Sequence, residues 1–230
     1  RDIARALNIV QQASMSVVAN PLGGTLSLAV LPTFATRWLG PRLGKFLNAH
    51  PGISVNVSTR IGHLDFAGET FDAAIYYGIG DWDGVNHQKL FNETMTACIA
   101  PEFSQKYPIR QLEDLAGLPM LQLESRPSVW LDWFEGQGAA PYATGGMLMD
   151  QYSMMIQSAI SGLGVALLPD YLAQIEISEG RLVPVLKTNV PVRGAYWLVW
   201  PKDKVDHAPL KTFRGWLGEQ TDAILHGVEC

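Results

Sequence analysis

The hydrophobic pattern changes period twice between residues 25 and 60, and the changes predict a strand, a helix and a second strand. Residues 25–31 form an almost unbroken apolar run, which is typical of a central strand buried on both faces. In residues 34–47 the apolar positions fall on one helical face. Pro41 predicts a kink in this helix, or its restart just before the proline. Residues 53–58 alternate between aliphatic and polar positions, which favours a strand at the sheet edge, so the segment is one βαβ unit.

The same alternation of strand and helix patterns continues to the end of the chain. Further strands are expected at 72–77, 87–90, 94–100, 118–123, 144–148, 165–168, 182–185 and 195–200. Further helices are expected after Pro101, after Ser128, at 151–161, after Pro169 and at 209–225. Ser128 and Asp150 are the predicted N-caps of the second and third of these helices. The pattern indicates an α/β protein with two similar open sheets, helices on both faces of each, and a cleft between them.

Residues 1–18 contain no Pro or Gly, and their apolar positions repeat at alternating steps of three and four. This short heptad seam predicts a helix that is either the end of a longer coiled coil or a packed surface helix. Residues 20–24 are rich in Pro and Gly and predict a linker. Because the chain begins at Arg1 without a methionine, we expect it to be a fragment or a processed product.

Composition limits the classes of function. The 230 residues, 47% of them hydrophobic and 17% charged, are typical of a globular protein with one large or two modest domains. A net charge of -5 gives no basic footprint, so this chain by itself is not expected to bind nucleic acid. We find neither an export signal nor an apolar run long enough to span a membrane. The 2 Cys and 5 His residues show no metal-ligand spacing, so we expect no disulfide, metal or cofactor, and a reducing cytosol.

An enzyme is disfavoured as well. The sequence shows no Ser, His and Asp in the order of a catalytic triad, no paired carboxylates and no phosphate-binding loop. Residues 162–164 read Gly-Leu-Gly, but they lack the third glycine of a dinucleotide-binding motif and lead into a strand.

The end of the first strand is the first candidate binding site. Thr33 follows Pro32 at the predicted N-cap of the helix, where free backbone N–H groups lie at the carboxyl edge of the sheet. A small anionic or polar ligand is expected there, in the crevice outside the strand ends. Alternatively, Thr33 is only a helix cap. The loop from Gly78 to Trp82 either folds over this pocket or is a simple Gly-rich turn.

The order of these segments resembles one family. A linker helix, the βαβ unit of residues 25–60, then FDAAIYYG and SAISGLGVALLPDYL, is similar to the effector-binding domain of LysR-type bacterial transcriptional regulators. The Thr-Phe-Ala-Thr turn, the YYGIGDW loop and the AYWLVW strand look most like the glycine-cleavage-activator and β-lactamase-activator branch. The resemblance covers nearly the whole chain. The family's N-terminal winged helix-turn-helix is absent from it and is expected just upstream of Arg1.

The resemblance implies a periplasmic-binding-protein-like fold of type II, with two Rossmann-like subdomains joined by two crossover strands. Subdomain I is expected to comprise residues 24–98 and 194–230, and subdomain II residues 99–193, after an N-terminal linker helix at 1–20. The two crossings are expected within residues 94–100 and 193–196.

The resemblance also implies a function. We expect a cytoplasmic regulator that binds a small effector in the cleft between the subdomains and forms a homodimer or homotetramer. The effector would stabilise one hinge angle and so modulate DNA binding by the missing helix-turn-helix. A stand-alone solute-binding protein of the same fold is the alternative, although it should carry an export signal.

The candidate site residues lie at strand ends and helix starts. The expected effector-binding residues are Pro32, Thr33, Phe34, Arg60, Tyr77, Gly78, Trp82, Ser125, Ser128, Ser153 and Tyr196. Ser153 and Tyr196 match family positions implicated in effector response, and Asp65 matches a position that governs the inactive state, so it is a candidate conformational latch. The expected dimer interface contains Trp38, Leu43, Leu47, Met155 and Ile156.

Each of these roles has a structural alternative. Arg60 can be a solvated surface charge, Tyr196 plain core and Asp65 only a helix cap. The apolar faces assigned to the dimer can equally be those of helices that pack on their own sheets.

Overall fold

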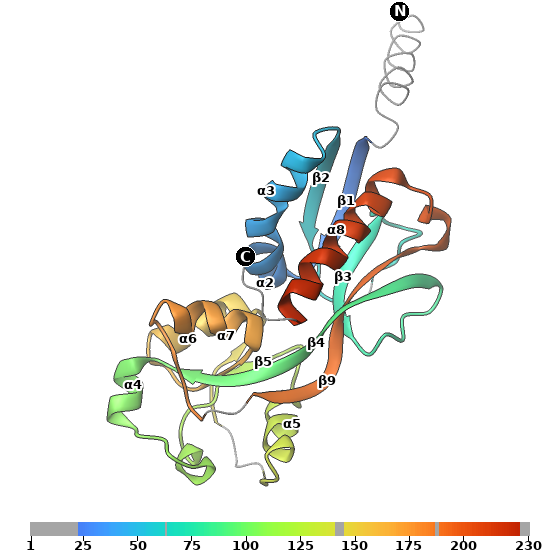
Figure 1. Cartoon of the computed structure of the whole chain (residues 1–230). Coiled ribbons are helices and arrows are strands. Elements are labelled where there is room, and N and C mark those ends of the chain that lie inside the picture. The colour runs from blue at the N-terminus through green and yellow to red at the C-terminus, as the bar shows by residue number, and fades with distance from the viewer. Residues whose placement is uncertain (1–22, 63, 141–144, 187–188, 226–230) are drawn as a thin grey trace, which may run out of the picture. The chain divides into compact units, whose positions relative to one another are not determined.

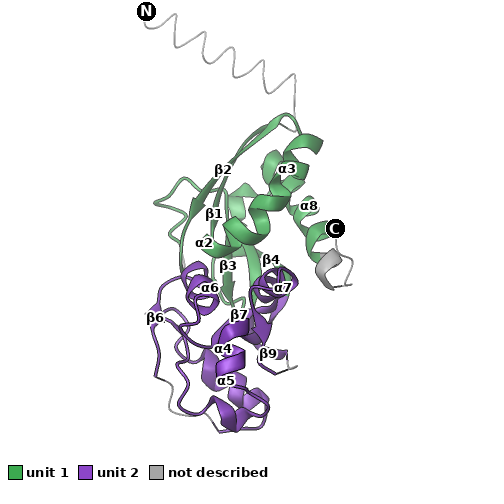
Figure 2. Cartoon of the chain, turned by 90° about the vertical axis from the view of Figure 1, so that its left-hand side faces the viewer, with its two compact units in different colours: residues 1–91, 195–230 green, residues 92–194 purple. Residues whose placement is uncertain are grey.

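The computed structural model of the chain describes residues 23–62, 64–140, 145–186 and 189–225 (Figure 1). The linker helix predicted at 1–20 lies outside these residues. The chain divides into two compact units, shown in different colours in Figure 2. Unit 1 comprises residues 1–91 and 195–230, and unit 2 comprises residues 92–194.

Two long strands run from one unit into the other. They are β4 (Val85–Ile99) and β9 (Val190–Pro201). The sequence predicted two strands, 87–90 and 94–100, in place of β4, and this prediction is wrong. The strand continues through Asn92 and Glu93, between the two predicted ranges, with the Glu93 side chain buried.

Hydrogen bonding links seven strands, and their main order is β2-β1-β3-β9-β4-β7 with β8 paired to β4. The two separate sheets expected from the sequence are therefore joined, because β4 and β9 are members of both units. The pair β5-β6 forms a sheet of its own.

Unit 1 is built on the predicted βαβ segment. Strands β1 (Gly24–Val30), β2 (Ile53–Thr59) and β3 (Ala73–Gly78) are parallel, and β9 pairs antiparallel to β3. As predicted, β1 is central with buried leucines, and β2 lies at the sheet edge with exposed polar residues.

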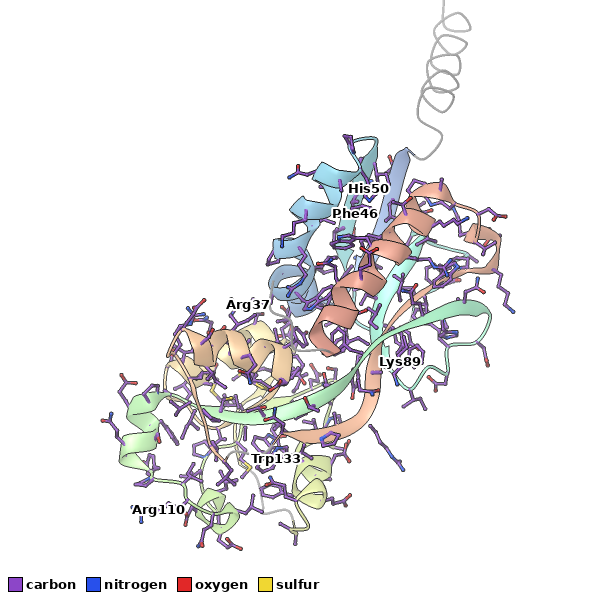
Figure 3. The ribbon with its side chains drawn as sticks, in the orientation of Figure 1. Arg37, Phe46, His50, Lys89, Arg110 and Trp133 are labelled. Atoms are coloured by element: carbon purple, nitrogen blue, oxygen red, sulfur yellow. The ribbon has the colours of Figure 1, made fainter. Side chains whose placement is uncertain are left out.

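One helical path connects β1 to β2. It consists of α2 (Pro32–Phe34), a π-helical turn (Ala35–Leu39) and α3 (Gly40–Ala49). The sequence predicted a kink or a restart here, and the path changes from π-helical to α-helical at Gly40, one residue before Pro41, without leaving the helical conformation. The C-terminal helix α8 (Ala208–Leu225), preceded by a 3-10 turn (Lys202–Lys204), packs against α3. Phe46, labelled in Figure 3, joins these helices, with its ring centroid 5.4 Å from that of Phe213.

Loops cover the other face of this sheet. Ala29, Ala74, Tyr76 and Val199 form a cluster with Trp82, and Leu64, Phe66 and Phe71 pack against it. The expectation of helices on both faces is wrong for this unit, because aromatic side chains from the loops after β2 and β3 take that place.

Unit 2 contains shorter strands and more helices around one hydrophobic core. Its helices are α4 (Pro101–Lys106), a 3-10 turn (Leu112–Leu115), α5 (Val129–Gly136), α6 (Tyr152–Ile160) and α7 (Asp170–Ser178). Its strands, besides β4 and β9, are β5 (Gln122–Leu123), β6 (Leu148–Met149), β7 (Ala166–Pro169) and β8 (Val183–Pro184). Trp133, labelled in Figure 3, is fully buried in this core.

Two helix starts in unit 2 test the predicted caps. Ser128 is the N-cap of α5 as predicted, although its hydroxyl lies 3.4 Å from Asp132 and does not cap a backbone N–H. The prediction for Asp150 is wrong. Gln151 adopts the extended conformation of an N-cap residue, so α6 begins one position later.

None of the described helices, α8 included, has both the length and the hydrophobicity of a membrane span.

Candidate functional site

The helical path of unit 1 starts directly at the end of β1. Leu31 is the N-cap of α2 and Pro32 is its first residue, so Thr33 is inside the helix and not the predicted N-cap. The correction has a physical cause, because the fixed backbone angle of a proline suits the first helical position. Thr33 is only 6% exposed. Thr33 is therefore a buried residue of the first helical turn and not its cap.

Aromatic rings gather around Tyr196, on the side of the sheet that α2 covers. The Tyr196 centroid lies 5.3 Å from that of Phe34, 4.9 Å from that of Phe91 and 5.4 Å from that of Tyr77. Tyr77 and Tyr196 are also register partners between β3 and β9. Tyr196 is only 2% exposed. The structure thus brings together three of the predicted residues, of which Phe34 and Tyr196 are buried and Tyr77 is half-buried.

Trp82 belongs to the opposite face of the same sheet. Its ring lies 5.0 Å from Tyr76 and 5.6 Å from Phe66, in the cluster that the loops form. Tyr76 and Tyr77 are adjacent on β3, and adjacent side chains of a strand point to opposite faces. Burial raises the pKa of the Tyr76 phenol, and the Asp81 carboxylate adds to the effect. Gly78 accepts a hydrogen bond of 3.0 Å from the Trp197 indole through its carbonyl oxygen, which fixes the start of the loop.

Arg60 and Asp65 lie in the loop after β2. The Arg60 guanidinium lies 3.5 Å from the Glu69 carboxylate and stacks over the Phe71 ring at 5.4 Å. The pair is half exposed, so solvent screens it. Asp65 is exposed, and its carboxylate accepts a hydrogen bond of 3.0 Å from the Ala67 N–H. This is a local turn, so Asp65 does not cap a helix, which was the structural alternative for it.

The predicted serines belong to unit 2 and are all exposed. Ser125 lies in the turn after β5, Ser128 starts α5, and Ser153 is the second residue of α6. The Ser153 hydroxyl lies 3.4 Å from the Gln151 side chain.

Sequence analysis missed a buried network whose members Arg126 and Tyr152 are neighbours in sequence of Ser125 and Ser153. The Arg126 guanidinium donates to the Glu93 carboxylate and, at 2.7 Å, to the Tyr152 hydroxyl. The Glu93 side chain is 1% exposed and that of Arg126 13% exposed. The three residues come from β4, the turn after β5 and the start of α6, so no local pattern could have grouped them.

The residues expected at a dimer interface differ in exposure. Trp38, Met155 and Ile156 are buried in the cores of their own units, and Leu43 and Leu47 are half-buried. The exposed apolar side chains nearby in sequence are Met154 on α6, 51% exposed, and Leu148 on β6, 66% exposed.

Metal and thiol chemistry find little support in the described residues. They contain no group of three or more His, Cys, Asp or Glu side chains that could hold a metal ion. Cys98 on β4 is buried, and burial raises the pKa of its thiol to about 12.

Comparison with known proteins places these features in context. The model of the LysR substrate binding domain family matches residues 19–222. The HTH-type transcriptional activator AmpR of Rhodobacter capsulatus is 34% identical over 213 residues, which cover 90% of this chain and 72% of the relative. The glycine cleavage system transcriptional activator of Escherichia coli K12 is 31% identical over 218 residues, which cover 94% of this chain and 71% of the relative.

Solved structures agree with the sequence matches. The effector domain of AmpR of Pseudomonas aeruginosa superposes with a TM-score of 0.80 at 30% identity, covering 89% of this chain and 98% of that domain. The effector-binding domain of AmpR from Citrobacter freundii gives a TM-score of 0.78 at 28% identity, covering 86% of this chain and 98% of that domain. A variant of the Citrobacter domain with one threonine, one serine and one tyrosine replaced gives a TM-score of 0.77 at 27% identity, covering 86% of this chain and 98% of that one.

Proposed function

Because this chain belongs to the LysR substrate-binding domain family, we propose that it binds a small effector through residues of both units and signals binding to a DNA-binding domain. The observation that carries the proposal is the placement of hydroxyl side chains. Thr33 lies at the start of α2 in unit 1, and Ser125 and Ser153 lie at a turn and a helix start in unit 2. The Citrobacter variant offers support, since the threonine, serine and tyrosine replaced in it are of the same residue types as Thr33, Ser153 and Tyr196.

The mechanism needs only a difference in affinity. An effector that contacts Thr33 in one unit and Ser125 and Ser153 in the other would stabilise one arrangement of the units over another. It can shift the equilibrium by no more than the difference between its affinities for the two arrangements. The boundaries proposed for the moving parts are residues 24–98 with 194–230, and residues 99–193. Asp65, in the loop after β2, is proposed as a latch that favours the inactive arrangement.

The chemistry of the candidate residues suggests the class of effector. Thr33, Ser125 and Ser153 offer hydroxyl groups that both donate and accept hydrogen bonds. A polar small molecule with carbonyl, carboxylate or hydroxyl groups would satisfy them. Phe34, which follows Thr33 in sequence, stacks on Tyr196, and the two rings would shape that part of the site.

The remaining parts of the proposal concern assembly and place of action. We propose a cytoplasmic regulator that is not an enzyme, uses no cofactor and reaches DNA through a winged helix-turn-helix beyond this chain. A homodimer or homotetramer would form by contact of α3 and β2 of one copy with α6 of another. In that contact the exposed Met154 would touch the other copy, whereas its neighbours Met155 and Ile156 are buried in their own unit.

A thermal-shift experiment tests the effector proposal. Glycine, a muramyl dipeptide and benzoate serve as probes of an amino acid, a cell-wall fragment and an aromatic acid. A probe at one hundred times its Kd should add about 2.7 kcal/mol to the free energy of unfolding. The Thr33→Val variant should lose this shift while its unliganded melting temperature stays the same.

Thr25→Val is the matched control, because Thr25 is exposed at the opposite end of β1 and its hydroxyl forms a hydrogen bond with that of Ser54 on β2. It should keep the full shift. A probe that stabilises the Thr33→Val variant as much as the native chain would refute the role of Thr33.

A further inference from the structure

The ion pair of Arg126 and Glu93 joins three segments of unit 2. Glu93 is the second residue of this unit, at the point where β4 enters it. Arg126 lies in the turn after β5, and Tyr152 is the first residue of α6. The guanidinium therefore contacts the crossing strand and the helix start at once, through Glu93 and the Tyr152 hydroxyl.

The backbone of Arg126 organises its own turn as well. Its N–H donates to the Leu123 carbonyl at 3.0 Å, which closes the turn that contains Ser125. Its carbonyl accepts a hydrogen bond of 3.2 Å from the Val129 N–H, which opens α5. Ser125 directly precedes Arg126, and Ser153 directly follows Tyr152. Each proposed effector serine of this pair is thus adjacent to a member of the network.

Stability alone gives a weak reason for such a pair. Removing two charges from water costs about as much as their attraction returns, so apolar residues of similar size often serve stability as well or better. What a planar guanidinium with fixed donors supplies is geometry, because it holds two acceptors at a set spacing and angle. Here the two acceptors belong to β4 and α6.

We propose that Arg126 is a positioning residue that sets the spacing between Ser125 and Ser153 and fixes both to the crossing strand β4. The inference rests on the proposed effector function. It adds a route by which the state of the effector serines is coupled to β4, the strand that continues into unit 1.

Unit 2 offers a matched control pair. Glu176, which is fully buried, accepts a hydrogen bond of 2.6 Å from Arg181, five residues further along the chain. This pair closes the turn after α7 and is adjacent to none of the proposed effector residues. Arg181→Met and Arg126→Met therefore both remove the cation from a buried glutamate, but only Arg126 belongs to a network adjacent in sequence to the two serines.

Hydrogen–deuterium exchange of the unliganded chain provides the first test. Arg126→Met should speed exchange at least tenfold in residues 122–128 and 152–156, whereas Arg181→Met should leave these segments unchanged. Tyr152→Phe keeps the ring and removes only the hydroxyl, so it should affect residues 152–156 alone. Unchanged exchange in Arg126→Met, or the same change in Arg181→Met, would overturn the proposal.

Calorimetric titration with the same three probes provides the second test. For a probe that binds the native chain, Arg126→Met should raise Kd about tenfold, which corresponds to about 1.4 kcal/mol. Arg126→Lys keeps the charge but reaches only one acceptor, so it should recover part of the affinity, and Arg181→Met should stay within about twofold of the native value.

The two tests separate the two claims. If none of the probes binds the native chain, the effector proposal fails for those ligand classes, and the exchange result still decides the role of Arg126. If a probe binds and its Kd is the same in Arg126→Met and in the native chain, the positioning role is refuted and the effector proposal stands.

Discussion

Phe46 provides a direct test of whether the two units unfold together. Its side chain is fully buried between α3 and α8, with ring centroids 5.4 Å from Phe213 and 5.1 Å from Trp216. Phe46→Ala removes most of this contact within unit 1 and leaves unit 2 untouched. A buried Phe→Ala substitution costs about 3–5 kcal/mol.

The size of the melting shift depends on how many residues unfold as one. The entropy of unfolding is about 2.1 cal/mol/K per residue, so a loss of about 4 kcal/mol lowers the melting temperature by about 8 °C if all 230 residues unfold together. If unit 1 unfolds alone, roughly half as many residues are involved and the shift is about 15 °C. We expect the smaller shift and one transition, because β4 and β9 are members of both units.

Circular dichroism and scanning calorimetry measure both quantities. Val57→Ala, at a side chain 40% exposed on the edge strand β2, is the control and should stay within about 0.5 kcal/mol of the native chain. Two separate transitions in Phe46→Ala, with the upper one at the native temperature, would refute the reasoning that the crossing strands couple the units.

Two further predictions concern the Gly80 turn and the buried thiol. Gly80 and Gly84 both have φ near +80°, but a Cβ at Gly80 would lie 2.7 Å from the Trp197 ring and one at Gly84 would meet nothing. In urea unfolding, Gly84→Ala should cost about 1 kcal/mol and Gly80→Ala about 1–3 kcal/mol more, and equal costs would contradict the packing of Trp197. The Cys98 pKa of about 12 lies above its unfolded value, so this thiol contributes stability that is lost as the pH rises from about 8.5 toward 12. Labelling of Cys98 at pH 8 in a Cys230→Ser variant should follow unfolding, and fast labelling of the folded chain would contradict its burial.

The elements that the sequence predicted well are those with a local signal. The apolar run of β1, the alternation of β2 and the single apolar face of α3 each depend on residues a few positions apart. The exact helix starts depended on one conformational choice. Because Pro32 is the first helical residue, the N-cap of α2 is Leu31 and not Thr33. In α6 the N-cap is Gln151 and not Asp150.

The elements that it missed depend on partners far away in the chain. The predicted strands 87–90 and 94–100 left out Glu93, which the structure buries inside β4. A carboxylate buried in an apolar strand is costly when it has no partner. The partner of Glu93, Arg126, lies 33 residues further on, and only the folded chain brings the two together. The continuity of β4 and the network around Arg126 therefore depend on the same long-range ion pair. The periodicity of the sequence could predict neither of them.

The candidate site divides for a related reason. Tyr77 and Trp82 were grouped because they flank one loop, yet the strand places Tyr77 against Tyr196, while the loop folds Trp82 back against Tyr76 on the other face. The path of a loop decides on which face of the sheet its residues lie. Gly78 and Gly80 allow this loop several paths, and the contacts of both glycines with Trp197 select one of them. A role of Trp82 in effector response would therefore run through the shape of this loop. Direct contact remains open to Thr33, whose position at the end of β1 is set by the βαβ unit itself.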